Sequence, residues 1–268
     1  RKSSIGALYY SFFAGQDLKL EGIGLVGGNC HANNQATKSW LVFISGVWTD
    51  TDNGYTITAH TLNVSSYSLS FGALSAYQSM ATMVISTTNY TFTSGGTYTG
   101  IYYIGNGYSA TIESNVTIIG SVFAEGGVLI AGSGVQITPS GSNPAIMTGG
   151  DLVITTFASG EFRSNGTLVS LGNMTLAGNQ ITVAPSVGRP LALVCHGLLT
   201  LNSGRYDTTG GIVGRTGIAF VSVTDVDITA VGAYPALATE GSWTASGSTI
   251  KLAGFGYVAG SATLLNST

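Results

Sequence analysis

From about residue 110 onward the sequence repeats one short unit, a strand-like run of aliphatic and β-branched residues followed by a corner of Gly, Ser and Asn. The runs read NVTII, GVQIT, DLVIT, GTLVSL, NQITVA, GLLTL, DVDITA and STIKLA. They recur irregularly, at roughly 15 to 27 residues, within or near the range of stacked solenoid coils. Because each coil of a right-handed β-helix buries its inward aliphatic residues against the next coil, such a sequence suits that fold. We therefore predict an all-β protein with a right-handed parallel β-helix over residues 110–268.

Two β-sandwich or jelly-roll domains are the alternative, since strands in those folds recur about every 8–12 residues. Aromatic residues are denser before residue 110 than after it. This change divides the chain into an aromatic-rich β region, residues 1–109, and the solenoid-like region, residues 110–268. One continuous domain is the other interpretation.

Two local elements are predicted in the N-terminal region. The segment WLVFISGVWTDTDNGYTITAHTLNV places Asn53-Gly54 between two β-rich arms, and both residues tolerate the positive φ of a type I′ turn. We predict a β-hairpin over residues 40–64. The best helix candidate is GALSAYQSMATMV at 72–84, although it lacks a clear cap.

Charge is unusually scarce. The chain has 9 Lys or Arg and 12 Asp or Glu among 268 residues, which is 8% charged, against about a quarter in ordinary domains. Because 44% of the residues are hydrophobic, the chain has enough apolar surface to fold. Without clustered Lys and Arg, nucleic acid is not an expected partner. No apolar run is long enough for a transmembrane helix.

The same composition indicates an exported protein whose surface is covered by copies of itself or by sugar. The sequence starts at Arg1 rather than Met, which fits a mature chain after removal of an export signal. We predict an extracellular, cell-surface or virion-surface location. The glycosylation candidates are the asparagines of six Asn-x-Ser/Thr sequons, Asn63, Asn89, Asn115, Asn165, Asn173 and Asn266.

The two cysteines each precede a histidine, in Cys30–His31 and Cys195–His196. Neighbours on a strand point to opposite faces, so the two side chains of one doublet do not converge on one metal ion or one substrate. We predict no metal site and no cofactor. In a chain with an exported composition, the two cysteines predict a Cys30–Cys195 disulfide. The alternative is two buried thiols, because Cys195 lies in an apolar run.

Candidate chemistry is limited to one acidic pair. Asp225 and Asp227 are two residues apart, so on a strand both carboxylates face the same way, and glycosidases use such pairs. Alternating Asp is also typical of a solvent-facing strand. Residues that either stack on sugar rings or pair across strands are Tyr90, Tyr98, Tyr102, Tyr103, Tyr108, Trp40, Trp48 and Trp243.

The N-terminal segment SSIGALYYSFFA, residues 3–14, is short, apolar and aromatic. It either packs within its own domain or adds as a strand to the edge of a neighbouring subunit. The strand-donation candidates are Ile5, Leu8, Tyr10 and Phe12.

Taken together, these features predict a structural subunit of an extracellular filament, surface coat or virion appendage. It self-associates through charge-poor β surfaces, with copies of itself and glycans as its partners, and we do not expect an enzyme. The alternative is a carbohydrate-binding or polysaccharide-cleaving β-helix spike, with Asp225 and Asp227 as the acids.

Overall fold

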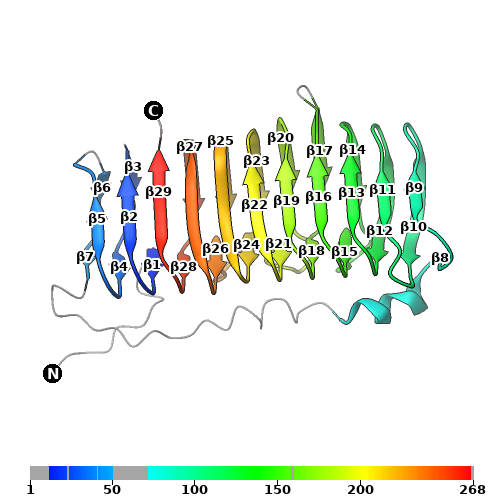
Figure 1. The fold of residues 1–268 in the computed structure, drawn as a ribbon, viewed down its shortest axis with the longest axis horizontal. Coiled ribbons are helices and arrows are strands. Elements are labelled where there is room, and N and C mark those ends of the chain that lie inside the picture. Colours follow the sequence, from blue (N-terminus) through cyan, green and yellow to red (C-terminus); the bar gives the residue numbers. More distant parts are fainter. Residues whose placement is uncertain (1–11, 23, 41, 51–71, 158–159, 267–268) are drawn as a thin grey trace.

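The computed structural model describes residues 12–22, 24–40, 42–50, 72–157 and 160–266. Its strands stack as a parallel β-solenoid of about 11 turns, which confirms the all-β solenoid prediction (Figure 1). Every pairing among the described strands is parallel, and 27 strands belong to one sheet that wraps around the coils. β3 and β6 pair separately from it.

Each coil has three sides, which we name faces A, B and C. Face A consists of β8 (Met83–Ile85), the second halves of β10 (Thr97–Ile104) and β12 (Thr117–Ala124), β15 (Ile146–Thr148), β18 (Leu168–Ser170), β21 (Leu191–Cys195), β24 (Gly211–Gly214), β26 (Leu237–Thr239), β28 (Gly256–Val258), β1 (Phe12–Ala14), β4 (Cys30–Ala32) and β7 (Trp48–Thr49).

Face B consists of β9 (Tyr90–Phe92), β11 (Ala110–Ile112), β13 (Val128–Ala131), β16 (Leu152–Thr155), β19 (Met174–Ala177), β22 (Leu198–Asn202), the first parts of β25 (Gly217–Thr229) and β27 (Ser242–Ala253), β29 (Ala262–Asn266), β2 (Leu18–Glu21) and β5 (Ala36–Lys38). Face C consists of the first halves of β10 and β12, β14 (Val135–Thr138), β17 (Glu161–Ser164), β20 (Gln180–Val183), β23 (Arg205–Thr209), the later parts of β25 and β27, β3 (Gly24–Val26) and β6 (Val42–Ile44).

The order of coils in space differs from their order in the chain. β1 pairs with β28 on one side and β4 on the other, and β2 lies likewise between β29 and β5. The N-terminal coils, residues 12–50, therefore continue the stack beyond the C-terminal strands, as the blue and red ribbons in Figure 1 show. Strands on both sides of residue 110 also pair directly, since β10 adds to β12 and β11 to β9.

The core fills the inside of the solenoid. Inward side chains from all three faces are aliphatic or aromatic and almost fully buried, while residues between them point outward. Where β10 and β12 run from face C to face A without a loop, Gly100 and Gly120 adopt positive φ values of 114° and 149°. A Cβ on Gly120 would lie 1.8 Å from the Gly100 carbonyl oxygen, so this corner requires glycine.

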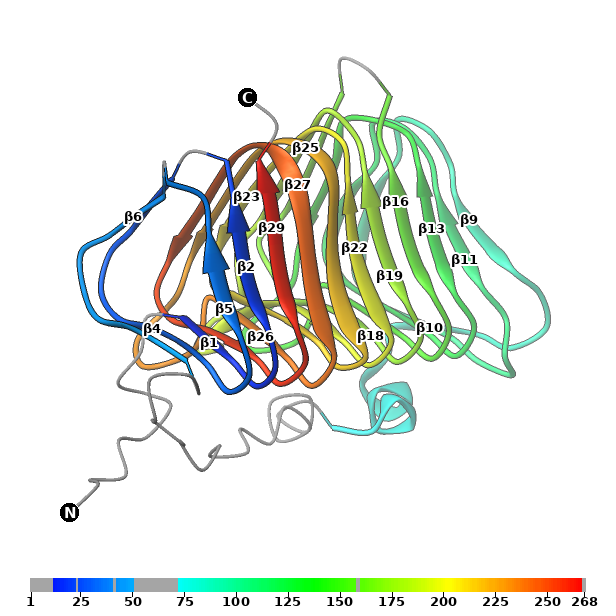
Figure 2. The ribbon, with the colours of Figure 1, turned by 60° about the vertical axis from the view of Figure 1, so that its left-hand side comes forward.

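Face A is also buried on its outer side. Its outward residues form a second apolar cluster, which includes Tyr103, Phe123, Met147, Val169, Val194, Val213 and Tyr257. The helix predicted near 72–84 appears here as the 3₁₀ helix η3 (Leu74–Met80), which lies outside the coils (Figure 2). Its buried residues Leu74 and Tyr77 are three apart, which matches three residues per turn, and Tyr77 stacks on Phe123 with ring centroids 4.1 Å apart.

The structure corrects the described arm of the hairpin predicted at 40–64. β6 and β7 lie on different faces and pair in parallel with β3 and β4, because each takes its place in the solenoid coil. The Asn53-Gly54 turn and the second arm lie outside the described residues. No helix in the described part of the chain is long and apolar enough to span a membrane.

Among the strand-donation candidates, Phe12 lies in β1, which pairs with β28 and β4 of its own chain. Ile5, Leu8 and Tyr10 lie outside the described residues.

We expect Phe13→Ala to lower the free energy of unfolding by about 3–5 kcal/mol, as for other buried Phe→Ala changes. Phe13 is 1% exposed and its ring stacks on Tyr257 and on His31, with centroid distances of 5.5 Å in both cases. Denaturant unfolding measures the change, and hydrogen exchange should rise first in residues 12–50. The exposed Gln136→Ala is the control and should stay within about 0.5 kcal/mol of wild type; an equal effect of the two changes would contradict the packing described.

Candidate functional site: the threonine ladder of face B

The outward residues of face B form one continuous row along the solenoid. Each is the register partner of the next, because the parallel strands are in step from coil to coil. We call this row the threonine ladder; it consists of Thr91, Thr111, Leu129, Val153, Thr175, Thr200, Ala219, Thr244 and Thr263, and continues to Lys19 and Thr37.

The threonine ladder is one row of a regular grid of outward side chains on face B. Adjacent strands in a sheet lie ~4.8 Å apart, and residues on one side of a strand recur every ~6.6 Å. A second outward row runs beside the ladder at that distance: Ala131, Thr155, Ala177, Asn202 and Val221, and then Ser246 and Leu265 after a register shift in β25. Short hydroxyl and methyl groups thus repeat in two directions over face B.

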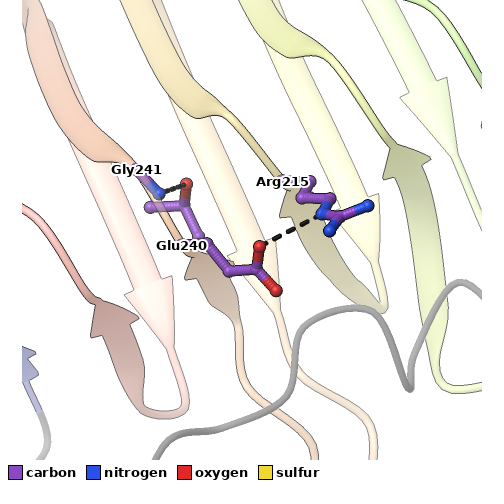
Figure 3. A network of polar contacts seen from close by, with 4 residues as sticks. Arg215, Glu240 and Gly241 are labelled. Carbon is purple, nitrogen blue, oxygen red and sulfur yellow. Dashed lines mark hydrogen bonds and ion pairs between the residues drawn. The ribbon is translucent and has the colours of Figure 1, made fainter.

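Face B is poor in charge along most of its length. Between Thr91 and Thr263 the ladder positions hold no ionisable side chain. The charged residues begin only on the N-terminal coils, where Lys19 and Glu21 form an ion pair of 2.8 Å. Arg215 and Glu240 form another, at 3.1 Å, on the corner that follows face A (Figure 3). From Thr91 to Thr263 the ladder is therefore bordered by charges but contains none.

The strands hold the ladder rigidly in place. The inward residues on either side of each ladder position, such as Ile112, Ile130, Ile154 and Leu176, are fully buried in the core. Threonine is itself restricted in χ1 on a strand. An open, shallow depression lined by Ser109, Thr111, Leu129, Asp151 and Val153 lies along the edge of the same surface. Face B is thus a preorganised surface rather than a cleft.

The structure places the acidic pair on face C. Asp225 and Asp227 both lie on the outer side of β25, in register with Arg205 and Asp207 of β23. The Asp227 carboxylate is 4.0 Å from Lys251 Nζ, and this face also carries the Arg163–Glu161 pair at 2.5 Å. Face C thus resembles a charged solvent face, and a catalytic role for Asp225 and Asp227 stays a prediction.

The structure corrects the predicted Cys30–Cys195 disulfide: both cysteines are free and buried. Cys195 lies in β21 and Cys30 in β4, with β24, β26, β28 and β1 between them. Five strand spacings separate them by roughly 24 Å, far beyond the ~7 Å limit for bridged Cα atoms. Strand alternation tells which side of a strand a cysteine occupies, but not which coil it joins.

Cys195 instead has a structural partner. It follows Thr148 and Ser170 in one register row, and each of the three side chains bonds to a turn carbonyl. The Thr148 hydroxyl donates to Gly150 O, Ser170 Oγ donates to the same oxygen at 3.0 Å, and Cys195 Sγ donates to Gly172 O at 3.3 Å. The thiol therefore replaces a hydroxyl that closes the corner between faces A and B.

The strand alternation predicted for the Cys–His doublets is found at Cys30. Its side chain points into the core, while His31 points outward and stacks on Phe13. His31 Nδ1 is 2.7 Å from Thr49 Oγ1, and Nε2 is 3.0 Å from Asn33 Oδ1. Among the described residues no group of three His, Cys, Asp or Glu is placed to hold a metal ion.

Most of the tyrosines proposed to stack on sugars pack against each other at one end of the solenoid. Tyr90, Phe92, Tyr98 and Tyr102 form a cluster with ring centroids 4.9–6.1 Å apart, mostly edge to face. Tyr102 is in the core and the other two tyrosines pack against it. Their arrangement matches the cross-strand interpretation of the sequence.

The described sequon asparagines all lie on exposed corners. Asn89 Oδ1 accepts from Ser109 N at 2.9 Å, and Asn173 Oδ1 accepts from Leu198 N at 3.0 Å. Asn165 Nδ2 donates to Thr138 Oγ1 at 3.3 Å, and Asn115 has a positive φ of 57°. Asn63 and the side chain of Asn266 lie outside the described residues. Glycosylation of these sites stays a prediction.

The threonine ladder was missed at the level of sequence, although a local signal exists. Six strands carry threonine between two apolar residues: YTF at 90, ATI at 110, MTL at 174, LTL at 199, WTA at 243 and ATL at 262. On a strand this pattern places two side chains inward and the hydroxyl outward. The repeated motif indicates one shared outer face.

Comparisons with known proteins add little to this picture. No protein-family model matches the chain, and no curated protein matches it. One solved structure is similar, described as the crystal structure of an ice binding protein from an Antarctic Biological Consortium. The two chains share 13% identity over 99% of this chain and 89% of the other, with a TM-score of 0.28.

We expect a thiol reagent to leave both cysteines of the folded protein unmodified. Burial raises the pKa of each thiol to about 12, so very little of the reactive thiolate is present near neutral pH. Titration with an aromatic disulfide, without reductant, should detect no thiol in the folded protein and two thiols in the denatured protein. A denatured chain with no free thiol would show that a disulfide exists after all.

We expect the protein to lose stability as the pH falls below the ordinary histidine pKa of 6.5. Burial lowers the pKa of His31, outweighing its bond to Asn33 and the nearby Asp50 charge, so the folded state favours neutral imidazole. At a pH below 6.5 the unfolded chain therefore binds more protons than the folded chain. The contribution of His31 to the free energy of unfolding is fully present above pH 6.5 and is lost as the pH falls below it. Unfolding between about pH 7 and pH 5 measures the slope. His31→Gln should flatten it; an unchanged slope would assign the effect to another group, such as His196.

Proposed function

We propose that this protein binds a flat, ordered surface through the threonine ladder of face B, and that this surface is ice. The observation that supports the proposal is the uncharged ladder, in register over nine coils from Thr91 to Thr263. Six of these nine positions are threonine. A grid of this kind fits a partner that is itself a lattice.

The chemistry of threonine suits a surface made of water. Its hydroxyl exchanges hydrogen bonds with water, and its methyl group is weakly hydrated. Strand spacings of ~4.8 Å and ~6.6 Å are comparable to the distances between water oxygens that repeat in hexagonal ice. Charged side chains hold water in orientations set by the charge, so their absence allows water over face B to follow the lattice.

The rigidity of the ladder strands and the number of ladder positions compensate for the weakness of each single contact with ice. The ladder side chains stand on strands whose inward neighbours are packed in the core, so binding costs little conformational entropy. Nine positions engage at once on a flat partner, as in multivalent binding. A small or mobile ligand would contact few of them.

Other partners fit this surface less well. Sugar polymers are held by outward aromatic rings, and none of the ladder positions is aromatic. Phosphate groups require clustered Lys and Arg, which appear on face B only at Lys19 and Lys38.

We expect Thr175→Lys to weaken binding to ice by at least about tenfold, equivalent to ~1.4 kcal/mol. Thr175 lies at the centre of the ladder, where a long charged side chain lifts the surface from the lattice and orients water around itself. Partition of fluorescently labelled protein into growing ice and the thermal hysteresis of the solution measure the effect.

Thr182→Lys is the matched control. Thr182 is the outward threonine of the next strand, β20, on face C, and its exposure is similar. It should bind ice as the wild type does, and both variants should keep the wild-type circular dichroism and melting temperature. Equal loss in both variants, or a wild-type protein that ice excludes, would refute the proposal.

Self-association through face B, in an extracellular structural assembly, is the second candidate. Apolar side chains on this face are exposed, with Leu129, Leu198, Val221 and Leu265 each 41–43% accessible. The low charge of the chain and its sequons support a surface or extracellular location with glycan neighbours. If this candidate holds, sedimentation without ice detects face-to-face dimers that Thr175→Lys dissociates; a wild type without such dimers excludes it.

A further inference from the structure

We propose that copies of this chain stack end to end, with the terminal coil at one end of the solenoid pairing as parallel strands with the terminal coil of the next copy. This proposal uses the ends of the solenoid and does not rest on ice binding by face B.

Each end of the solenoid has unpaired strand edges. At one end β5, β6 and β7 pair only with β2, β3 and β4. At the other end β8 and β9 pair only with β10 and β11, and the first half of β10 pairs only with β12. Within the described structure, no strand pairs with the far side of any of these strands. Two of their backbone groups have side-chain partners, since Ala36 N donates to Asp50 Oδ2 at 3.4 Å and Val42 O accepts from Lys38 Nζ. Such edges are templates for another chain.

The two ends match in the order of their faces and in strand direction. One terminal coil offers β7, β5 and β6 on faces A, B and C, and the other offers β8, β9 and β10 on the same faces. Because every coil junction in the molecule is parallel, a second copy shifted along the axis meets the first with all strands in the same direction. The threonine ladder then continues across the junction from Thr37 to Thr91.

The molecule already contains one junction of this kind. β1 and β2 stack on β28 and β29 although more than 200 residues separate them in the chain. Aromatic contacts hold this junction together: Phe13 is stacked on Tyr257, and Phe12 lies 5.3 Å from Trp243 between ring centroids. Coils therefore join edge to edge in this protein without being consecutive in sequence.

Among the described residues, several apolar side chains at both ends are exposed. Trp40, Phe43 and Val47 are 82%, 62% and 56% exposed in the β5–β7 coil, and Met83 and Val84 of β8 are each 45% exposed. Natural edge strands are usually blocked by lysine, proline or a bulge. The six terminal strands contain one charged residue, Lys38, whose Nζ donates to Val42 O at 3.1 Å within the coil.

A contact between two different ends of the molecule is heterologous. Copies related by a shift along the solenoid axis do not close into a ring. The expected assembly is therefore an unbranched rod, one solenoid wide, that lengthens with concentration. Its threonine ladders lie in one line.

The test uses the two ladder positions that meet at the junction. In Thr37→Lys/Thr91→Lys, like charges face each other between copies, and we expect rods to form only at a concentration about tenfold higher or more. In Thr37→Lys/Thr91→Glu, opposite charges meet and assembly should return toward the wild-type level. Sedimentation velocity over a concentration series and negative-stain electron microscopy measure the rods, and circular dichroism confirms the fold.

Thr175→Lys separates this proposal from ice binding, since it alters the centre of face B and leaves both ends intact; its rods should match those of the wild type. A wild type that remains a monomer at every concentration overturns the proposal. Rods that are unaffected by Thr37→Lys/Thr91→Lys overturn it as well.

Discussion

The parallel hydrogen-bond ladder between successive coils is the constraint on which the rest of this structure depends. Each coil is too small to have a core of its own, and it becomes stable only by pairing with the coils above and below it. The pairing keeps the strands in register, so each outward position stands above its counterpart for the length of the solenoid. A single strand pattern is thereby turned into a surface property of the whole molecule.

The three faces use this register for different purposes. Face A is apolar on both sides and is partly covered by η3, through contacts such as Tyr77 with Phe123. Face C carries ion pairs such as Lys251–Asp227. Face B carries the threonine ladder, without charge from Thr91 to Thr263. The few charged residues of the described chain lie mostly on face C, on the corners and on the N-terminal coils, so the ladder from Thr91 to Thr263 is left neutral.

The position of residues 12–50 shows how little chain order constrains a solenoid. β1 and β2 pair with β4 and β5, which follow them in the chain, and on their other side they extend the stack at β28 and β29, near the opposite end of the sequence. A free edge of the correct direction can accept a coil that is distant in sequence, because backbone groups pair in the same way in every strand and side chains such as Phe13 and Tyr257 pack across the junction. The same property leaves two edges open at the ends, and these edges underlie the proposed rods.

The sequence by itself determined the all-β solenoid and the opposite orientations of Cys30 and His31. It also located a helix within 72–84, although the structure has a 3₁₀ helix over Leu74–Met80 and a strand from Met83. These features follow from local alternation and from glycine corners, which act within a few residues. Sequence reasoning did not find the pairing partners: it predicted a Cys30–Cys195 bridge that five coil spacings forbid, and an antiparallel arm where β6 and β7 pair in parallel. It also overlooked the threonine ladder. Alternation tells which side of a strand a residue occupies, but only the tertiary stack decides which residues become neighbours, because the register between coils depends on corner lengths and core packing throughout the molecule.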